Sequence, residues 1–121
     1  MNTWLGDPAR IMFLEAALET VKRDNLMELN QITGKHLLNG LREYCKQYPH
    51  LINNARGIGT FCAYDGVDSS VRDKIYVGLR NAGIQTGPCG IKSMRLRPAL
   101  NFTPKHADIF LNKLGHVLAS L

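Results

Sequence analysis

The sequence predicts an α+β fold in which helices cover a small, mostly antiparallel sheet. Three observations support this prediction. Helical and β-prone segments follow one another in the order helix, helix, strand, helix, strand, strand, helix. Two helices begin with a capping residue followed by proline, at Asp7-Pro8 and Thr103-Pro104. Two strands are joined by a short glycine- and proline-rich segment, which favours a hairpin.

The length fits one domain or part of a larger one. The chain has 121 residues, of which 45% are hydrophobic. This is enough to bury a core, and the apolar fraction excludes wholesale disorder. No internal repeat or low-complexity segment divides the chain, so we expect residues 1–121 to form a single domain.

Two helices are predicted in the first part of the chain. The first begins at Asp7-Pro8, and its apolar residues recur at three- and four-residue steps, at Ile11, Leu14, Leu18 and Val21. The polar stretch 22–25 interrupts this pattern. A second, longer helix is predicted from Leu26 until Pro49 stops it. Its apolar stripe consists of Leu29, Ile32, Leu37, Leu41, Tyr44 and Tyr48.

The middle of the chain predicts a strand followed by a helix. Residues 56–64 are β-prone and contain Gly57 and Gly59, which indicates a strand whose start closely approaches other backbone. We expect a turn at residues 65–66. A third helix, capped by Asp68 or Ser69, is expected to end at Gly83 in a left-handed conformation.

The last part predicts a hairpin and a final helix. Residues 84–86 read as a strand, residues 87–90 as a turn, and residues 93–97 as a strand with period-two alternation that Pro98 ends. The final helix begins at Thr103. Its apolar stripe consists of Ala107, Phe110, Leu111, Leu114, Leu118 and Leu121.

Composition narrows the classes of function without deciding between them. Fifteen Lys and Arg against ten Asp and Glu give a net charge of +5, which fits anionic substrates or nucleic acid. No apolar run approaches the roughly 18 residues of a membrane span, and no signal peptide is visible. The three cysteines and four histidines have neither disulfide-framework nor metal-ligand spacing, so no metal site is predicted.

Few residues have the pattern of catalytic machinery. Gly57 and Gly59 precede a strand and no third glycine opens a helix, so they are not a phosphate-binding fingerprint. Cys62 lies in an apolar segment and is expected to be a small buried hydrophobe, whereas Cys89 between glycines and proline is expected to be exposed.

The most distinctive local feature is the pair Arg95 and Arg97. In a strand these two residues share one face, opposite Met94 and Leu96. Two guanidinium groups side by side suit a carboxylate or phosphate. From spacing alone, an exposed face with ordinary ion pairs remains open as the alternative.

Three segments carry a family resemblance. Residues 2–8 (NTWLGDP), 56–62 (RGIGTFC) and 89–100 (CGIKSMRLRPAL) occur in this order. Together they resemble the C-terminal part of the mitochondrial-type 4-aminobutyrate aminotransferases, a class-III group of the fold-type-I pyridoxal-phosphate enzymes. The resemblance covers essentially the whole chain. It implies the C-terminal small domain of such an enzyme, with residues 1–25 as a connecting helix segment.

The resemblance also implies roles for four residues. Thr3 matches the threonine that reaches the cofactor phosphate of the neighbouring subunit in the dimer. Arg95 matches the arginine that pairs with the substrate α-carboxylate, while Arg97 receives no substrate contact. Gly87 and Gly90 match a glycine-rich loop beside the active site. The residue types at Ile58 and Pro88 differ from the family pattern, and these differences are expected to affect local geometry.

One absence limits what the chain is expected to do by itself. The Schiff-base lysine, the aspartate on the pyridine nitrogen and the stacking aromatic residue of the family lie upstream of the Thr3 equivalent, and no lysine here has a matching context. We therefore expect no catalysis by this chain alone, and no pyridoxal phosphate bound to it alone. The resemblance implies an upstream catalytic domain, a homodimer, small amino-acid and oxo-acid substrates, and the mitochondrial matrix.

Three hypotheses follow from the sequence. In the first, the chain is part of an enzyme that moves the amino group of 4-aminobutyrate to 2-oxoglutarate, giving succinate semialdehyde and glutamate. In the second, it is a stand-alone, non-catalytic interaction domain derived from an aminotransferase. The third is a nucleic-acid binder using Lys92, Arg95, Arg97 and Lys105; since few aromatic residues interleave with these charges, it ranks last. We expect neither nucleic acid nor a membrane as a partner.

Overall fold

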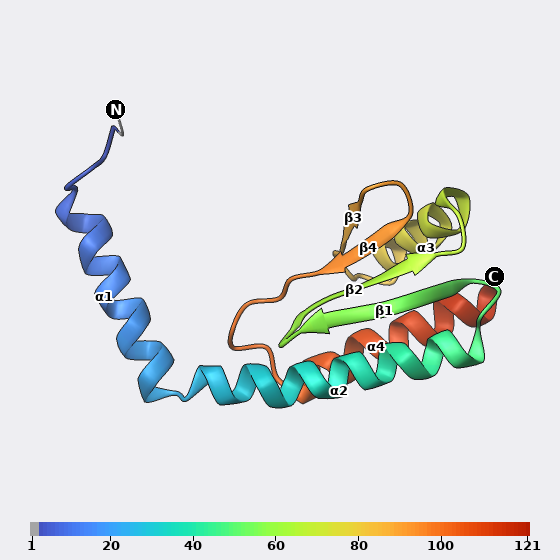
Figure 1. The fold of residues 1–121 in the computed structure, drawn as a ribbon, viewed down its shortest axis with the longest axis horizontal. Coiled ribbons are helices and arrows are strands. Elements are labelled where there is room, and N and C mark those ends of the chain that lie inside the picture. The colour runs from blue at the N-terminus through green and yellow to red at the C-terminus, as the bar shows by residue number, and fades with distance from the viewer. Residues whose placement is uncertain (1–2) are drawn as a thin grey trace.

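The computed structural model describes residues 3–121 and has an α+β architecture (Figure 1). Asn2, the first residue of the NTWLGDP segment, lies outside the described residues. The elements are, in chain order, α1 (Pro8–Arg23), α2 (Leu26–Gln47), β1 (Ile52–Ile58), β2 (Phe61–Gly66), α3 (Ser69–Asn81), β3 (Gly87–Cys89), β4 (Ser93–Leu96) and α4 (Pro104–Ser120). None of the described helices is long and apolar enough to span a membrane.

The strands form one open antiparallel sheet in the order β1-β2-β4-β3. Its core-facing residues belong to a single hydrophobic cluster with side chains from α2, α3 and α4. The strands contribute Ile52, Cys62, Tyr64, Met94 and Leu96 to this cluster. One face of the sheet is thus covered by helices, and the predicted fold class is confirmed.

Helix boundaries follow the predicted capping signals. The side chain of Asp68 accepts a hydrogen bond from the Val71 N–H at 2.8 Å and caps α3. Thr103 and His106 form a reciprocal capping box at the start of α4. Gly83 follows α3 with a φ of 86°, in the predicted left-handed conformation.

The prediction of one strand over residues 56–64 is wrong, because two strands share this stretch. β1 ends at Ile58 and β2 begins at Phe61, and Gly59 turns the chain with a φ of 56°. Glycine adopts this conformation without steric cost, so the second glycine closes a hairpin and does not continue a strand. The expected turn at residues 65–66 is likewise wrong, since both residues belong to β2.

The hairpin near residue 90 is displaced from its predicted position. Residues 84–86 are not a strand, and the strand β3 occupies residues 87–89, where a turn was expected. The turn lies at residues 90–92, with Gly90 at a φ of 56°. β3 is an edge strand, so only one of its two sides pairs with another strand. Pro88, which has no backbone N–H, is tolerated there because the unpaired outer side needs no hydrogen-bond donor.

A close approach of backbone to backbone joins α2 to the β1–β2 hairpin. Gly34 is buried on α2, and a Cβ there would overlap the carbonyl group of Gly59. Nearby, the Asn30 amide donates a hydrogen bond to the Thr60 hydroxyl at 2.7 Å. The expected tight backbone packing around the hairpin glycines is therefore present, and α2 supplies the partner.

The first helix stands apart from the rest of the fold. No residue of α1 is buried, and among the described elements α1 contacts only α2. The chain turns between the two helices at Asn25, which has a left-handed φ of 49°. Figure 1 shows α1 projecting away from the sheet at this corner.

Gly34→Ala tests the close approach. We expect a loss of about 1–3 kcal/mol in the free energy of unfolding, because the added methyl group meets backbone that has no rotamer to move. Without that collision, Ala would stabilise the helix by roughly 0.5–1 kcal/mol. A less stable variant therefore supports the close approach, and a more stable variant contradicts it. Chemical denaturation measures it, with the neighbouring exposed Lys35→Ala as control.

Candidate functional site

The alternation of side chains along β4 places Arg95 on the open face of the sheet. Met94 and Leu96 are buried in the core, whereas Arg95 between them is half-buried on the opposite face. Arg97 is exposed and lies just beyond the end of the strand. The predicted alternation is confirmed for residues 94–96, whereas the expected strand position of Arg97 is wrong, because β4 ends at Leu96.

Arg95 lies beside Gly87 of the edge strand. The two residues are partners in the β3–β4 register, and a Cβ built on Gly87 would lie 3.7 Å from the Arg95 Nη2 atom. Because glycine has no side chain, this part of the face stays open around the guanidinium group. The structure thus brings together two of the residues singled out in the sequence.

Within residues 3–121, Arg95 forms no ion pair or hydrogen bond through its guanidinium group. Arg56 lies in the same row of the sheet, separated from Arg95 by Ala63. Its Nη1 atom is paired with the Asp65 carboxylate at 3.1 Å. Of these two arginines, only Arg95 remains available for an external anion.

Arg95 also borders a cavity of about 530 Å³ at the β3–β4 end of the sheet. This is within the size range of small-molecule sites. The polar residues of its lining are Gln85, Thr86, Arg95, Arg97 and His106. The apolar wall includes Leu37, Leu96, Phe102, Ile109 and Phe110. The Thr86 hydroxyl is buried and has no hydrogen-bond partner among the described residues.

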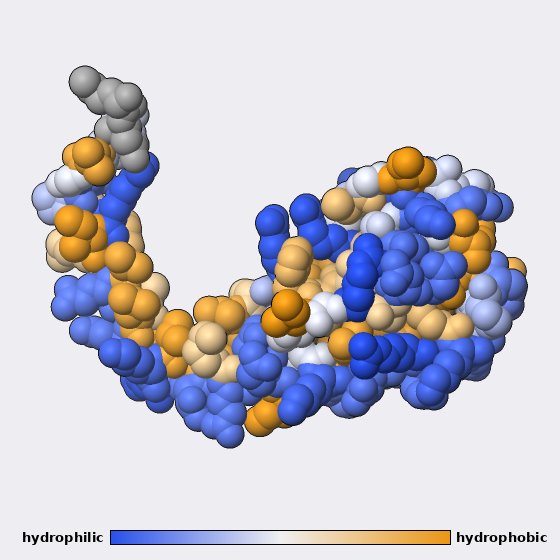
Figure 2. Space-filling model, viewed as in Figure 1, coloured by the Kyte–Doolittle hydropathy of each residue, from blue (hydrophilic) through white to orange (hydrophobic). Residues whose placement is uncertain are grey.

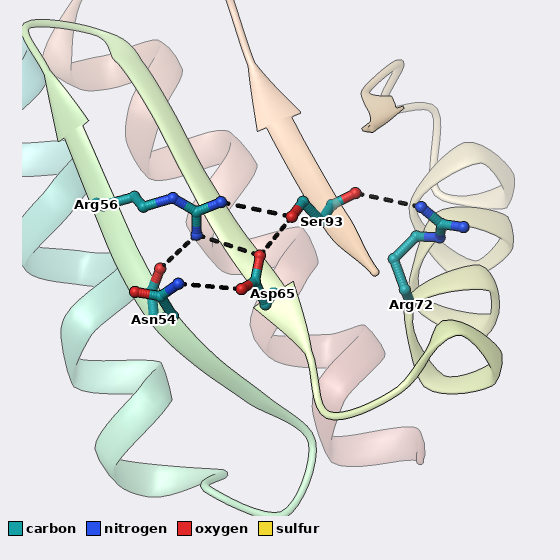
Figure 3. A network of polar contacts seen from close by, with 5 residues as sticks. All are labelled: Asn54, Arg56, Asp65, Arg72 and Ser93. Atoms are coloured by element: carbon teal, nitrogen blue, oxygen red, sulfur yellow. Dashed lines mark hydrogen bonds and ion pairs between the residues drawn. The ribbon is translucent and has the colours of Figure 1, made fainter. Parts of the chain in front are cut away.

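A polar network holds the neighbouring part of β4 in place (Figure 3). The Asp65 carboxylate accepts hydrogen bonds from the Ser93 hydroxyl at 2.5 Å and from the Asn54 amide at 3.0 Å. Arg56 contacts Asp65 and also donates to the Asn54 carbonyl and the Ser93 hydroxyl. From α3, Arg72 donates to the Ser93 carbonyl at 3.3 Å. The network therefore ties β1, β2, β4 and α3 together two residues before Arg95.

A bulge in β1 makes this network possible. Between Asn53 and Arg56 the strand has one residue more than the facing part of β2. Asn54 in the bulge has a φ of 56°, a conformation that asparagine tolerates better than most residues. The bulge brings the side chains of Asn54 and Arg56 to the same carboxylate.

The network also changes the acidity of Asp65. Burial by itself raises the pKa of this carboxyl group, whose side chain is 11% exposed. The hydrogen bonds from Ser93, Asn54 and Arg56, together with the positive charge of Arg56, outweigh burial and lower the pKa below its ordinary value. The folded protein thus favours the ionised form.

The other two residues implied by the resemblance lie away from this cluster. Gly90 is at the exposed β3–β4 turn, where a Cβ would meet nothing within 4 Å. Its left-handed φ is therefore the reason why glycine suits this position. Thr3 is exposed in the turn that precedes α1, the helix that projects away from the sheet (Figure 1). The chain therefore has two separate places of interest, one around Arg95 and Gly87 and one at Thr3.

Neither the lysines nor the cysteines add a nucleophile to the Arg95 cluster. All seven lysines are exposed, and none borders the cavity. Cys62 is buried as predicted, and burial raises the pKa of its thiol, which disfavours the reactive thiolate. Cys89 is exposed, as predicted. No lysine or cysteine of the described residues is among the residues that line the cavity beside Arg95.

Residues 1–118 match the family described as aminotransferase class-III. The chain belongs to the class-III aminotransferases. It is 43% identical over 118 residues to the human protein named "4-aminobutyrate aminotransferase, mitochondrial", covering 98% of this chain and 24% of that relative. The Dictyostelium discoideum 4-aminobutyrate aminotransferase is 39% identical over 120 residues, with 99% and 24% covered.

Solved structures share the fold of this chain. The lysine aminotransferase of M. tuberculosis superposes with a TM-score of 0.83 at 25% identity, covering 86% of this chain and 24% of that chain. A phospholyase from Arthrobacter in complex with phosphoethanolamine gives the same TM-score and identity, covering 88% and 27%. This class-III chain thus spans about a quarter of the length of the relatives it matches.

Sequence analysis missed the Asp65 network and the cavity of this aminotransferase domain. Asp65 was assigned to a turn, and the bulge that brings Asn54 and Arg56 to it has no pattern of its own in a single sequence. The cavity combines side chains from α2, the segment before β3, β4 and α4. The available signal was the charge of Asp65 inside an otherwise apolar segment, which demands a buried partner.

Asp65→Asn tests the network. At neutral pH we expect a loss of about 1–3 kcal/mol in the free energy of unfolding, because charge-assisted hydrogen bonds are lost. Since the folded pKa is depressed, the carboxylate stabilises the fold above its unfolded pKa of about 3.9, and this stabilisation disappears as the pH falls through the folded pKa.

The difference between wild type and Asp65→Asn should accordingly shrink below about pH 4 in a denaturation series. The exposed Glu15→Gln is the control and should change stability by less than about 0.5 kcal/mol. A difference that stays constant down to about pH 3 would contradict the role of the charge.

Proposed function

We propose that this chain is the C-terminal part of a pyridoxal-phosphate-dependent 4-aminobutyrate aminotransferase. In the proposed reaction the complete enzyme transfers the amino group of 4-aminobutyrate to 2-oxoglutarate, giving succinate semialdehyde and glutamate. The names of its relatives support this substrate class, and several of them also carry the word mitochondrial. The mitochondrial matrix is part of the proposal.

The unpaired guanidinium of Arg95 is the observation that carries the substrate role. It is half-buried at the edge of a cavity and has no acidic partner within the described chain. A guanidinium offers parallel N–H donors that match the two oxygens of a carboxylate. We assign Arg95 to the α-carboxylate of 2-oxoglutarate and of the glutamate formed from it, with Gly87 leaving room beside it.

The residues present do not form a complete site for pyridoxal phosphate. Neither the exposed lysines of this chain nor Thr3 line the Arg95 cavity. In the proposal, the Schiff-base lysine and most contacts with the cofactor belong to the upstream catalytic domain. The chain alone is therefore proposed to be inactive.

Thr3 has a different part in the proposal. Its hydroxyl is exposed in the turn before α1, and the resemblance assigns it to the cofactor phosphate of a second subunit. A hydroxyl and backbone N–H at a helix-proximal turn are chemically suited to a phosphate oxygen. This assignment makes the complete enzyme a homodimer.

Arg95→Ala in the complete enzyme tests the substrate assignment. We expect KM for 2-oxoglutarate to rise roughly 10- to 100-fold, since hydrogen bonds to charged groups contribute about 1.5–3 kcal/mol. KM for 4-aminobutyrate, which has no carboxylate next to its amino-bearing carbon, should change less. Arg95→Lys should recover only part of the loss, because an ammonium group keeps the charge but not the planar fork. Steady-state kinetics measure these changes.

Arg80→Ala is the matched control, since it removes the same group from an exposed position of α3 that does not border the cavity. We expect it to leave KM within about threefold of wild type, as is usual for an exposed side chain without assigned contacts. Equal effects of the two substitutions would show that only the net charge matters. No effect of Arg95→Ala would contradict the substrate assignment.

Complementation tests the division of the cofactor site between the two parts of the polypeptide. Mixing the chain with the complementary upstream segment and pyridoxal phosphate should give a yellow complex, while the chain alone stays colourless. Absorption spectroscopy after removal of free cofactor measures this, and Thr3→Ala should lower cofactor retention. A soluble complex that never binds the cofactor would contradict the proposal.

A further inference from the structure

The open face of the sheet carries Arg56, Asp65 and Arg95, which are the charged residues of the described strands β1–β4. The register places them in a compact group. Arg56 and Arg95 flank Ala63 in one row, and Asp65 follows Ala63 two residues later on β2. Figure 2 shows many hydrophilic residues on this side of the molecule, opposite α2 and α4. One carboxylate thus stands between two guanidinium groups.

Asp65 is a diagonal neighbour of both arginines. Ala63 pairs with Arg56 on one side and with Arg95 on the other, so Asp65 stands one diagonal step from each of them. Diagonal neighbours in an antiparallel pair are about 7–8 Å apart, which is within reach of long side chains. The placement of the backbone therefore offers the Asp65 carboxylate two alternative partners.

The carboxylate takes only one of these partners. It accepts hydrogen bonds from Arg56, Ser93 and Asn54 (Figure 3). No ion pair or hydrogen bond of the described residues joins it to Arg95. Its contacts lower the pKa of Asp65, so the group is ionised at neutral pH. Because its side chain is nearly buried, this charge requires partners within the protein, and Arg56 supplies the opposite charge.

We propose that Arg56 is a positioning residue for the proposed reaction. By holding the Asp65 carboxylate, Arg56 keeps it off Arg95 and leaves the Arg95 guanidinium free for 2-oxoglutarate. This inference rests on the proposed function, which assigns Arg95 to the α-carboxylate of that substrate. Arg56 itself receives no contact with the substrate. Its effect is on competition, because an internal ion pair and a substrate carboxylate would use the same N–H donors of Arg95.

A purely structural role of the network has a different consequence. If Arg56 only stiffened the sheet, its loss would disturb Arg95 whether or not Asp65 kept its charge. In the proposed arrangement the freed carboxylate itself causes the loss, so removing the charge of Asp65 should repair the loss of Arg56. The two explanations therefore differ in the sign of the coupling between the two substitutions.

Arg56→Gln in the complete enzyme tests the inference. We expect KM for 2-oxoglutarate to rise about fivefold with kcat nearly unchanged, because the apparent affinity falls with the fraction of Arg95 that remains unpaired. Adding Asp65→Asn should return KM to within about twofold of wild type, since the amide carries no charge. Ser93→Ala is the matched control. It removes one hydrogen bond to Asp65 but leaves Arg56 in place, and should change KM by less than about twofold.

A crystal structure of Arg56→Gln gives a readout that does not depend on activity. It should show the Asp65 carboxylate within about 4 Å of the Arg95 guanidinium. A carboxylate that stays with Asn54 and Ser93 overturns the inference. A raised KM that Asp65→Asn leaves in place overturns it too, and so does a Ser93→Ala effect as large as that of Arg56→Gln.

If Arg56→Gln does not fold, Arg56→Lys takes its place. An ammonium group holds a carboxylate as a point charge without the planar fork, so a smaller rise in KM, again reversed by Asp65→Asn, is expected. A rise that persists in the double variant contradicts the inference. If Arg95→Ala leaves KM unchanged, the substrate assignment is wrong and the inference falls with it. If Arg95→Ala raises KM and the Arg56 variants do not, only the inference about Arg56 is wrong.

Discussion

The two-residue alternation of β4 is the constraint on which the rest of the site depends. Burying Met94 and Leu96 against the helices obliges Arg95 to occupy the opposite face. A slip of one residue would place the guanidinium group in the apolar core and two apolar side chains in solvent. The energy of the core therefore fixes the orientation of the proposed ligand-binding residue, although no core residue touches the ligand.

Different interactions hold the two sides of the sheet. On the helical side, the backbone of α2 directly contacts the backbone of the β1–β2 hairpin, since no side chain lies between Gly34 and Gly59. On the open side, the Asp65 carboxylate joins three neighbouring strands through hydrogen bonds. Together they leave little freedom for β4, so Arg95 extends from a rigid support. A rigid support suits a group that must meet a carboxylate in one orientation.

Helices and their caps could be predicted because their signals are local. Asp68 and Thr103 cap the helices that follow them, and the proline after Thr103 occupies a position that needs no N–H donor. The strands near Gly59 and residue 84 could not be placed correctly, because a hairpin is defined by a partner strand and glycine fits both a strand and its turn. The family resemblance could place Arg95 and Gly87 near the same site. The Asp65 network could not be predicted, because it depends on a bulge and on side chains brought together from distant segments.

The corner between α1 and α2 gives a single residue control over the shape of the molecule. Asn25 interrupts two helices that together would form a straight rod of roughly 60 Å. Its left-handed backbone turns one helix away from the line of the other. The angle between α1 and the sheet-bearing body thus depends on a backbone conformation that asparagine adopts more readily than most residues. A β-branched residue at this position would strain the corner without touching the core or the face that carries Arg95.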